Sequence, residues 1–121
     1  MSHPGRTNRG LEELLTLDGV DLVLERRYWV SFRAWLVVPE ESIPHGLRYS
    51  LSLHYRYGHR IIGFDNAHVA KPRKRRFEPK ETLRDHWHQG DETLVYTFES
   101  PAKLMVDFWK QVEQSLDRHE S

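Results

Sequence analysis

Residues 47–57 show the clearest hydrophobic pattern of the chain. In LRYSLSLHYRY, leucine and tyrosine occupy every second position, and arginine, serine and histidine occupy the positions between them. Successive side chains of a strand point to opposite faces, so this alternation predicts a half-buried β-strand. A tight turn at Gly58 leads into RIIGF, and the two segments are expected to form a β-hairpin. The polar face of its first strand would carry Arg48, His54 and Arg56.

Further strands are predicted on both sides of this hairpin. Residues 20–38 are rich in valine, leucine and aromatic residues, which indicates one long bent strand or two short ones broken at Arg26-Arg27. TLVYTF, residues 93–98, is a short strand. A helix start at Ser100-Pro101 precedes apolar residues spaced three and four apart, so residues 101–117 should form an amphipathic helix. The predicted fold is α+β, an antiparallel sheet of four to five strands covered on one face by the C-terminal amphipathic helix.

The length of 121 residues suits one domain. Residues 1–10 are predicted to form a flexible N-terminal arm, and residues 11–121 a single α+β domain with a long basic loop at 66–92. Cysteine is absent, which excludes disulfides and thiolate chemistry. No stretch reaches the roughly 20 apolar residues of a spanning helix, and no signal peptide is visible. We therefore expect a cytoplasmic protein that does not contact the membrane.

The net charge of zero hides an uneven distribution. Residues 45–88 contain ten Lys and Arg against four acids, whereas the segments before and after contain five against seven and three against seven. The run KPRKRR, residues 71–76, is either a solvated loop or a contact for phosphates, and the basic middle favours an anionic partner unless the acidic segments neutralise it within the fold. The candidate nucleic-acid-binding residues are Arg48, Lys71, Arg73, Lys74, Arg75 and Arg76.

Four segments carry a family resemblance: IPHGLRYSL, RIIGFDN, DHWH and YTFESPAKLMVDFW. In this order they resemble the TumE family, toxins of bacterial type II toxin–antitoxin systems, over about residues 28–116. The chain differs from the family pattern by the insertion AHVAKPRKRRFEPKETLR between Asp-Asn and the His pair. The resemblance implies a toxin neutralised by a cognate antitoxin protein. The matching positions are His45, Gly46, Tyr49, Gly63, Phe64, Asp65, Asn66, Asp85, His86, His88, Tyr96, Phe98, Asp107 and Phe108.

The histidines suggest two kinds of chemistry. Imidazole titrates near neutrality, so His86 and His88 are candidates for proton transfer in metal-free RNA cleavage, with Asp65 orienting one ring and Arg56 on the phosphate. Alternatively, the pair could bind zinc or manganese with Asp65 or His68, although no HExxH motif or cysteine supports a metal site. We therefore predict no metal and no cofactor.

The remaining alternatives concern binding. Trp87 either stacks on a base or packs within the protein. The chain is either a ribonuclease-like toxin or a non-catalytic module that binds nucleic acid or protein through the same face. Gly-rich phosphate loops and nucleophile motifs are absent from the sequence, which argues against nucleotide-cofactor enzymes. The expected partners are the antitoxin, RNA or DNA, and, as a further option, a second copy of the chain.

Overall fold

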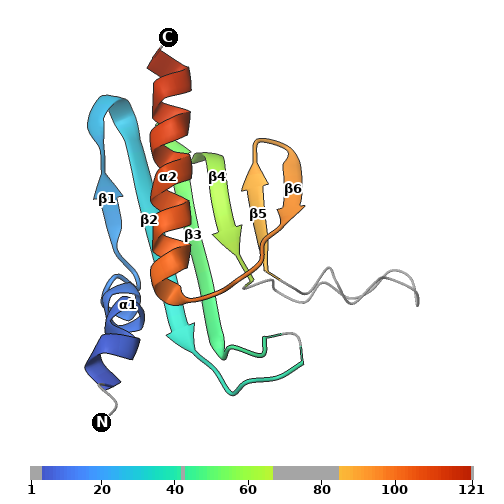
Figure 1. Cartoon of the computed structure of the whole chain (residues 1–121). Coiled ribbons are helices and arrows are strands. Elements are labelled where there is room, and N and C mark those ends of the chain that lie inside the picture. The colour runs from blue at the N-terminus through green and yellow to red at the C-terminus, as the bar shows by residue number, and fades with distance from the viewer. Residues whose placement is uncertain (1–3, 42, 67–84, 121) are drawn as a thin grey trace, which may run out of the picture.

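A computed structural model describes residues 4–41, 43–66 and 85–120 (Figure 1). The chain folds into a sheet with one long helix lying across it and a second helix beside it. In chain order the elements are α1 (Pro4–Thr16), β1 (Asp21–Val23), a 3₁₀ turn (Glu25–Arg27), β2 (Tyr28–Leu36), β3 (Leu47–Tyr55), β4 (His59–Asp65), β5 (His86–Gln89), β6 (Glu92–Val95) and α2 (Pro101–Glu120).

The sheet confirms the α+β prediction and adds a strand to it. Six strands follow one another in chain order, and every neighbouring pair is antiparallel. Of the two alternatives for residues 20–38, the structure shows two strands, β1 and β2, and both Arg26 and Arg27 at the break have positive φ. This left-handed backbone reverses the chain within three residues, so the short β1 becomes the edge strand beside β2.

The core lies between one face of the sheet and α2. Alternate residues of β2 and β3 are buried, as the period-two pattern predicted. Leu104, Phe108 and Val112 of α2 are almost fully buried against them. The Phe108 ring meets Phe32 edge to face at 5.7 Å, and Phe64 at 6.1 Å. The predicted helix on the leucine and tyrosine face of the sheet is therefore confirmed.

Two segments differ from the predictions. Residues 1–10 were predicted to be a flexible arm, but α1 begins at Pro4 and packs beside α2, where Gly10 comes so close to Ala102 that an added Cβ would lie 2.8 Å from it. The second segment is the predicted loop at 66–92, which contains β5 and the start of β6. Strand pairing with β4 explains this difference, since the pattern of a four-residue strand is too short to recognise by itself.

The opposite face of the sheet is not covered by either described helix. We call this surface the open face. The open face is formed by alternate residues of β2 to β5, among them Ser31, Arg33, Trp35, Arg48, Ser50, Ser52, His54, Gly63, Asp65, His86 and His88.

Neither α1 nor α2 is long and apolar enough to cross a membrane.

Candidate active site on the open face

The side chains of Asp65 and His88 are hydrogen-bonded on the open face. Asp65 ends β4 and pairs in register with His86, while His88 lies opposite Gly63. The Nε2 atom of His88 is 3.0 Å from Oδ2 of Asp65, and the two side chains are only 12% and 13% exposed. A carboxylate and an imidazole that are distant in the sequence thus meet because β4 and β5 are neighbours.

The two partners of His88 define its tautomer. A carboxylate can only accept, so the hydrogen lies on Nε2 and is donated to Asp65. Nδ1 then accepts from the Thr93 hydroxyl, which is 3.1 Å away on β6. Burial lowers the pKa of His88 below its ordinary value, Arg60 and His86 lower it further, and Asp65 opposes the shift. His88 is consequently neutral at pH 7, with Nδ1 as its basic nitrogen.

Arg60 brings a positive charge to this pair. Its side chain crosses Gly63, where an added Cβ would lie 3.2 Å from the guanidinium, and Nη1 is 3.9 Å from Oδ2 of Asp65. A residue larger than glycine at position 63 would therefore displace Arg60. Cation, carboxylate and imidazole lie together on one surface, which is an arrangement that can bind a phosphate and move a proton.

His86 and Trp87 occupy opposite faces of β5. His86 shares the open face with His88 but is only 8% exposed. Trp87 points toward α2 and stacks on Phe64 with ring centroids 5.6 Å apart. Of the two predicted roles for Trp87, packing within the protein is the one that the structure supports.

Arg56 is not brought to the histidine pair. Its Nε donates to the Tyr55 hydroxyl at 3.1 Å, and its guanidinium lies 5.1 Å above the Tyr55 ring. Arg56 precedes β4 whereas Asp65 ends that strand, so about 20 Å of strand separates the two positions. Arg60 occupies the place that the sequence analysis gave to Arg56.

A bulge explains why Arg60 was missed, and strand pairing explains why Thr93 was missed. Arg60 and Asp65 are five residues apart, so simple alternation puts them on opposite faces of β4. The β3–β4 register shifts after Leu53, and the extra residue turns Arg60 onto the face of Asp65. The pattern of alternation contains no signal for such a shift, and the bond from Thr93 depends on the β5–β6 pairing.

The other predicted binding and metal-ligating residues are Arg48, His54, His68 and the basic run. Arg48 lies on the open face, with Nη2 4.0 Å from a carboxylate oxygen of Glu40. His54 is held against Trp29, with centroids 4.1 Å apart, and by Ser52 at 2.7 Å. Within residues 4–41, 43–66 and 85–120 no group of three or more His, Asp or Glu could hold a metal ion. Lys71, Arg73, Lys74, Arg75, Arg76 and His68 lie outside the described residues.

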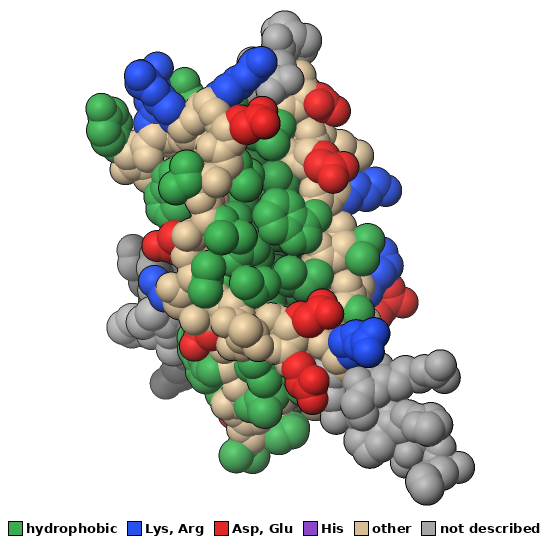
Figure 2. Space-filling model, turned by 90° about the vertical axis from the view of Figure 1, so that its left-hand side faces the viewer, with side chains coloured by type: hydrophobic (Ala, Val, Ile, Leu, Met, Phe, Trp, Pro, Cys, Tyr) green, Lys and Arg blue, Asp and Glu red, His purple; other side chains and the backbone are tan. Residues whose placement is uncertain are grey.

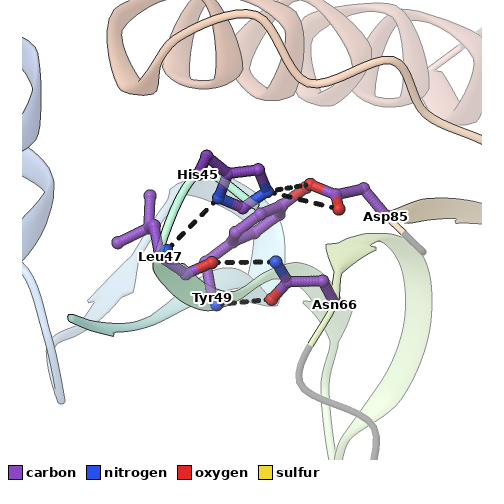
Figure 3. A network of polar contacts seen from close by, with 5 residues as sticks. All are labelled: His45, Leu47, Tyr49, Asn66 and Asp85. Atoms are coloured by element: carbon purple, nitrogen blue, oxygen red, sulfur yellow. Dashed lines mark hydrogen bonds and ion pairs between the residues drawn. The ribbon is translucent and has the colours of Figure 1, made fainter. Parts of the chain in front are cut away.

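A second polar network lies at the start of β3, on the side of α2 (Figure 3). Asp85 is 7% exposed and accepts from the Tyr49 hydroxyl at 2.7 Å and from Nε2 of His45 at 3.0 Å. The Leu47 amide donates to Nδ1 of His45 at 3.2 Å, which places the ring hydrogen on Nε2. Burial and the neighbouring Asp85 raise the pKa of Tyr49, so its hydroxyl keeps its proton and donates.

The backbone of Tyr49 is also hydrogen-bonded to the side chain of Asn66. The Tyr49 amide donates to Oδ1 of Asn66 at 2.9 Å, and Nδ2 of Asn66 donates to the Leu47 carbonyl at 2.8 Å (Figure 3). Asn66 and Asp85 flank residues 67–84 and are both bonded to Tyr49, an arrangement that we call the Tyr49 clamp. β4 and β5 pair directly beside it, from Asp65 to His86. The insertion therefore leaves the Asp65–His88 site intact.

Comparison with known proteins identifies the family. The family model described as Toxin TumE matches residues 10–116. The chain belongs to the TumE toxin family. No curated protein and no solved structure matches it. Membership in TumE implies a toxin and, with it, an antitoxin partner.

The positions that resemble TumE form two groups in the structure. Asp65, His86 and His88 belong to the open face. The larger group belongs to the Tyr49 clamp and its surroundings, where Phe98 stacks on His45 at 3.9 Å. In this group the Tyr96 hydroxyl donates to Asp107 at 2.5 Å.

The charges around Asp107 stabilise the second group. Burial raises the pKa of Tyr96, and the bond to Asp107 adds to this, so the hydroxyl stays protonated. Burial also opposes ionisation of Asp107, but hydrogen bonds from Lys103 and Tyr96 outweigh it and lower the pKa of Asp107. Asp107 therefore anchors the segment before α2 to the helix, a structural rather than a chemical role.

Proposed function

We propose that this TumE toxin acts on nucleic acid by cleaving RNA at the open face. The hydrogen bond between His88 and the Asp65 carboxylate, with Arg60 beside it, is the observation that supports this proposal. Burial holds His88 neutral at physiological pH, as a general base requires. The pair lies on a sheet surface that neither described helix covers, so a long polymer has room to approach it.

In the proposed reaction the 2′-oxygen of RNA attacks the adjacent phosphorus. The Thr93 hydroxyl rotates away, and Nδ1 of His88 takes the proton of the 2′-hydroxyl while Asp65 holds Nε2–H. The bond from phosphorus to the 5′-oxygen breaks, and His86, as the proposed general acid, gives a proton to that oxygen. The products are a 2′,3′-cyclic phosphate and a 5′-hydroxyl. Arg60, in place of Arg56, stabilises the charge on the phosphorane.

RNA binding would use the rest of the open face. Arg33 and Arg48 supply positive charge, and Trp35 is 42% exposed and available for stacking on a base. The run Lys71, Arg73, Lys74, Arg75 and Arg76 is joined to the site through Asn66 on one side and Asp85 on the other. We propose that these five cations contact phosphates of the bound RNA.

A non-catalytic binding module is the second candidate function. One observation favours it, namely that both nitrogens of His88 already have partners, Asp65 and Thr93. An imidazole held on both sides can be a structural bridge between β4, β5 and β6. In that case the same face would bind nucleic acid or protein without cleaving it.

A cleavage assay with purified protein distinguishes the two functions. We expect the parent to cleave RNA in the presence of EDTA and to leave 2′,3′-cyclic phosphate ends. His88→Ala and His86→Ala should each lose about 10²–10⁴-fold in rate, because each removes a proton-transfer group. The matched control is His59→Ala, the same change at an exposed histidine of the β3–β4 hairpin, which should keep full activity.

Three results would change the assignment. Activity lost in EDTA and restored by zinc or manganese would make the histidines metal ligands. Equal activity of His88→Ala and the control would refute the role of His88. A protein that arrests growth but cleaves no RNA between about pH 5 and 9 would support the binding module instead.

A further inference from the structure

An apolar groove lies on the side of the molecule away from β6, between β1 and α2. Its walls are Val23, Leu24 and Tyr28 on the sheet side and Trp109, Val112 and Leu116 on the helix side. The volume of about 590 Å³ is large enough for several side chains. Figure 2 shows these hydrophobic side chains gathered in the middle of this face.

The hollow continues along α2 toward α1. Met105, Val106 and Trp109 line its second part together with Glu13 of α1. Trp109 and Glu113 belong to both parts, so the two form one surface beside the helix. From residue 105 to residue 116 the helix rises by about 16 Å, which is three turns. Val23 and Val106 remain 84% and 61% exposed at the margins of this surface.

The margins of the groove are mainly acidic. Glu13, Glu25 and Glu113 line it, against a single lysine, Lys110. Within the described parts of the chain none of these three carboxylates takes part in an ion pair. Carboxylates border the hydrophobic patch on both sides in Figure 2. A partner that fits this surface has an apolar stripe with positive charges beside it.

We propose that this groove is the docking site of the antitoxin, and that the antitoxin occupies it with an amphipathic helix carrying Lys or Arg beside its apolar stripe. An apolar floor binds protein side chains and offers little to a nucleic acid, so the proposal requires a protein antitoxin. A helix fits better than an added strand, because β1 offers an edge of only three residues. Helices bind such grooves through apolar residues at i, i+3 or i+4, and i+7, which span about two turns and fit within the length of this groove.

This inference goes beyond the proposed function and depends only on membership in the toxin family. The groove and the Asp65–His88 site lie on different surfaces, because the groove borders α2 and the site faces away from it. Neutralisation would then not require the antitoxin to cover the open face. Loss of docking should leave toxicity unchanged, which separates a test of the groove from a test of the chemistry.

The experiment measures toxicity and antitoxin binding in the same variants. Val23→Asp and Glu113→Lys should each raise the dissociation constant for the purified antitoxin by roughly tenfold or more. In cells that also express the antitoxin, these toxin variants should escape neutralisation and still arrest growth. The matched control is Val38→Asp, since Val38 is also 84% exposed but lies outside the groove. Binding by the parent should weaken as salt is raised.

A peptide scan identifies the occupant directly. Overlapping synthetic peptides of the antitoxin should yield a binder that becomes helical on binding and contains Lys or Arg beside its apolar residues. An acidic or extended binder, or unchanged affinity in both groove variants, would overturn the proposal. It would equally fail if light scattering showed a dimer of the toxin that Val23→Asp dissociates while antitoxin binding stays the same, because the groove would then bind a second copy of the chain.

Discussion

Replacing Tyr49 with Phe tests the Tyr49 clamp with a single lost hydroxyl. Tyr49 is fully buried, so the phenylalanine ring can occupy the same space and create no cavity. The change removes the 2.7 Å bond to Asp85, whose side chain is only 9% exposed and retains His45 as a partner. Hydrogen bonds to charged groups contribute about 1.5–3 kcal/mol. We therefore expect a loss of about 2 kcal/mol in the free energy of unfolding.

The loss should be visible in thermal and chemical denaturation. At about 2.1 cal/mol/K per residue, 121 residues give an unfolding entropy of roughly 0.25 kcal/mol/K, so the melting temperature should fall by about 8 °C. In urea the midpoint should fall while the slope m stays constant, because the surface exposed on unfolding does not change. A matched control is Tyr55→Phe, whose hydroxyl accepts a bond from the exposed Arg56 and should contribute less than about 0.5 kcal/mol.

A double-mutant cycle with Asp85→Asn isolates the pair. Once the carboxylate is an amide, the hydroxyl makes only a neutral hydrogen bond, so Tyr49→Phe should then cost about 1 kcal/mol. If Tyr49→Phe melts within about 1 °C of the parent, the bond contributes nothing, and the reasoning about the clamp is refuted.

Three further predictions concern the core, the pH dependence and the basic run. Phe108→Asp places a charge at a fully buried position and should abolish soluble expression, whereas Val106→Asp on the exposed side of the same helix should express normally. If Phe108→Asp melts like the parent, the sheet–helix core is refuted. The pKa of His88 is lower in the fold than the ordinary 6.5, so below that pH the unfolded chain binds more protons than the folded one. The stability of the parent should therefore fall as the pH falls from about 6.5 through the folded pKa. In urea titrations His88→Gln should lose less stability than the parent between pH 7.5 and pH 5, and equal losses would contradict the shift. Replacing the four residues 73–76 by Ser should flatten the salt dependence of RNA binding by roughly one unit per lost phosphate contact, and an unchanged slope in filter binding would leave this run a solvated loop.

Much of the fold was predictable because long periodic segments determine it. The eleven-residue alternation at 47–57 and the helical spacing at 101–117 led to a strand and a helix that the structure confirms, with the helix on the predicted face. The short elements were not predictable in this way. β5 and β6 have four residues each, and their pairing partners determine their structure more than their composition does. The start of α1 was missed since its stabilising contacts with α2 are distant in the sequence.

The candidate site was predictable as a set of residue types but not as a geometry. The sequence suggested Asp65 and His88, and strand pairing puts them 3.0 Å apart. Arg56 was chosen by alternation, whereas the β-bulge in β4 gives the neighbouring place to Arg60. The network of His45, Tyr49 and Asp85 was not predictable, because hydrogen bonds between residues 36 to 40 positions apart have no local signature.

The Tyr49 clamp has a consequence for the variation of chain length within the family. Its bonds hold Asn66 and Asp85 on both sides of 18 residues, so the sheet register is established without any contribution from the length of that connection. Closing 18 residues in place of four costs only about 1.3 kcal/mol in loop entropy. The length and the charge of this connection can thus change during evolution at a small cost in folding free energy, while the sheet and the Asp65–His88 pair stay unchanged. For the same reason, a foreign domain or a new pair of chain ends should be tolerated between residues 66 and 85.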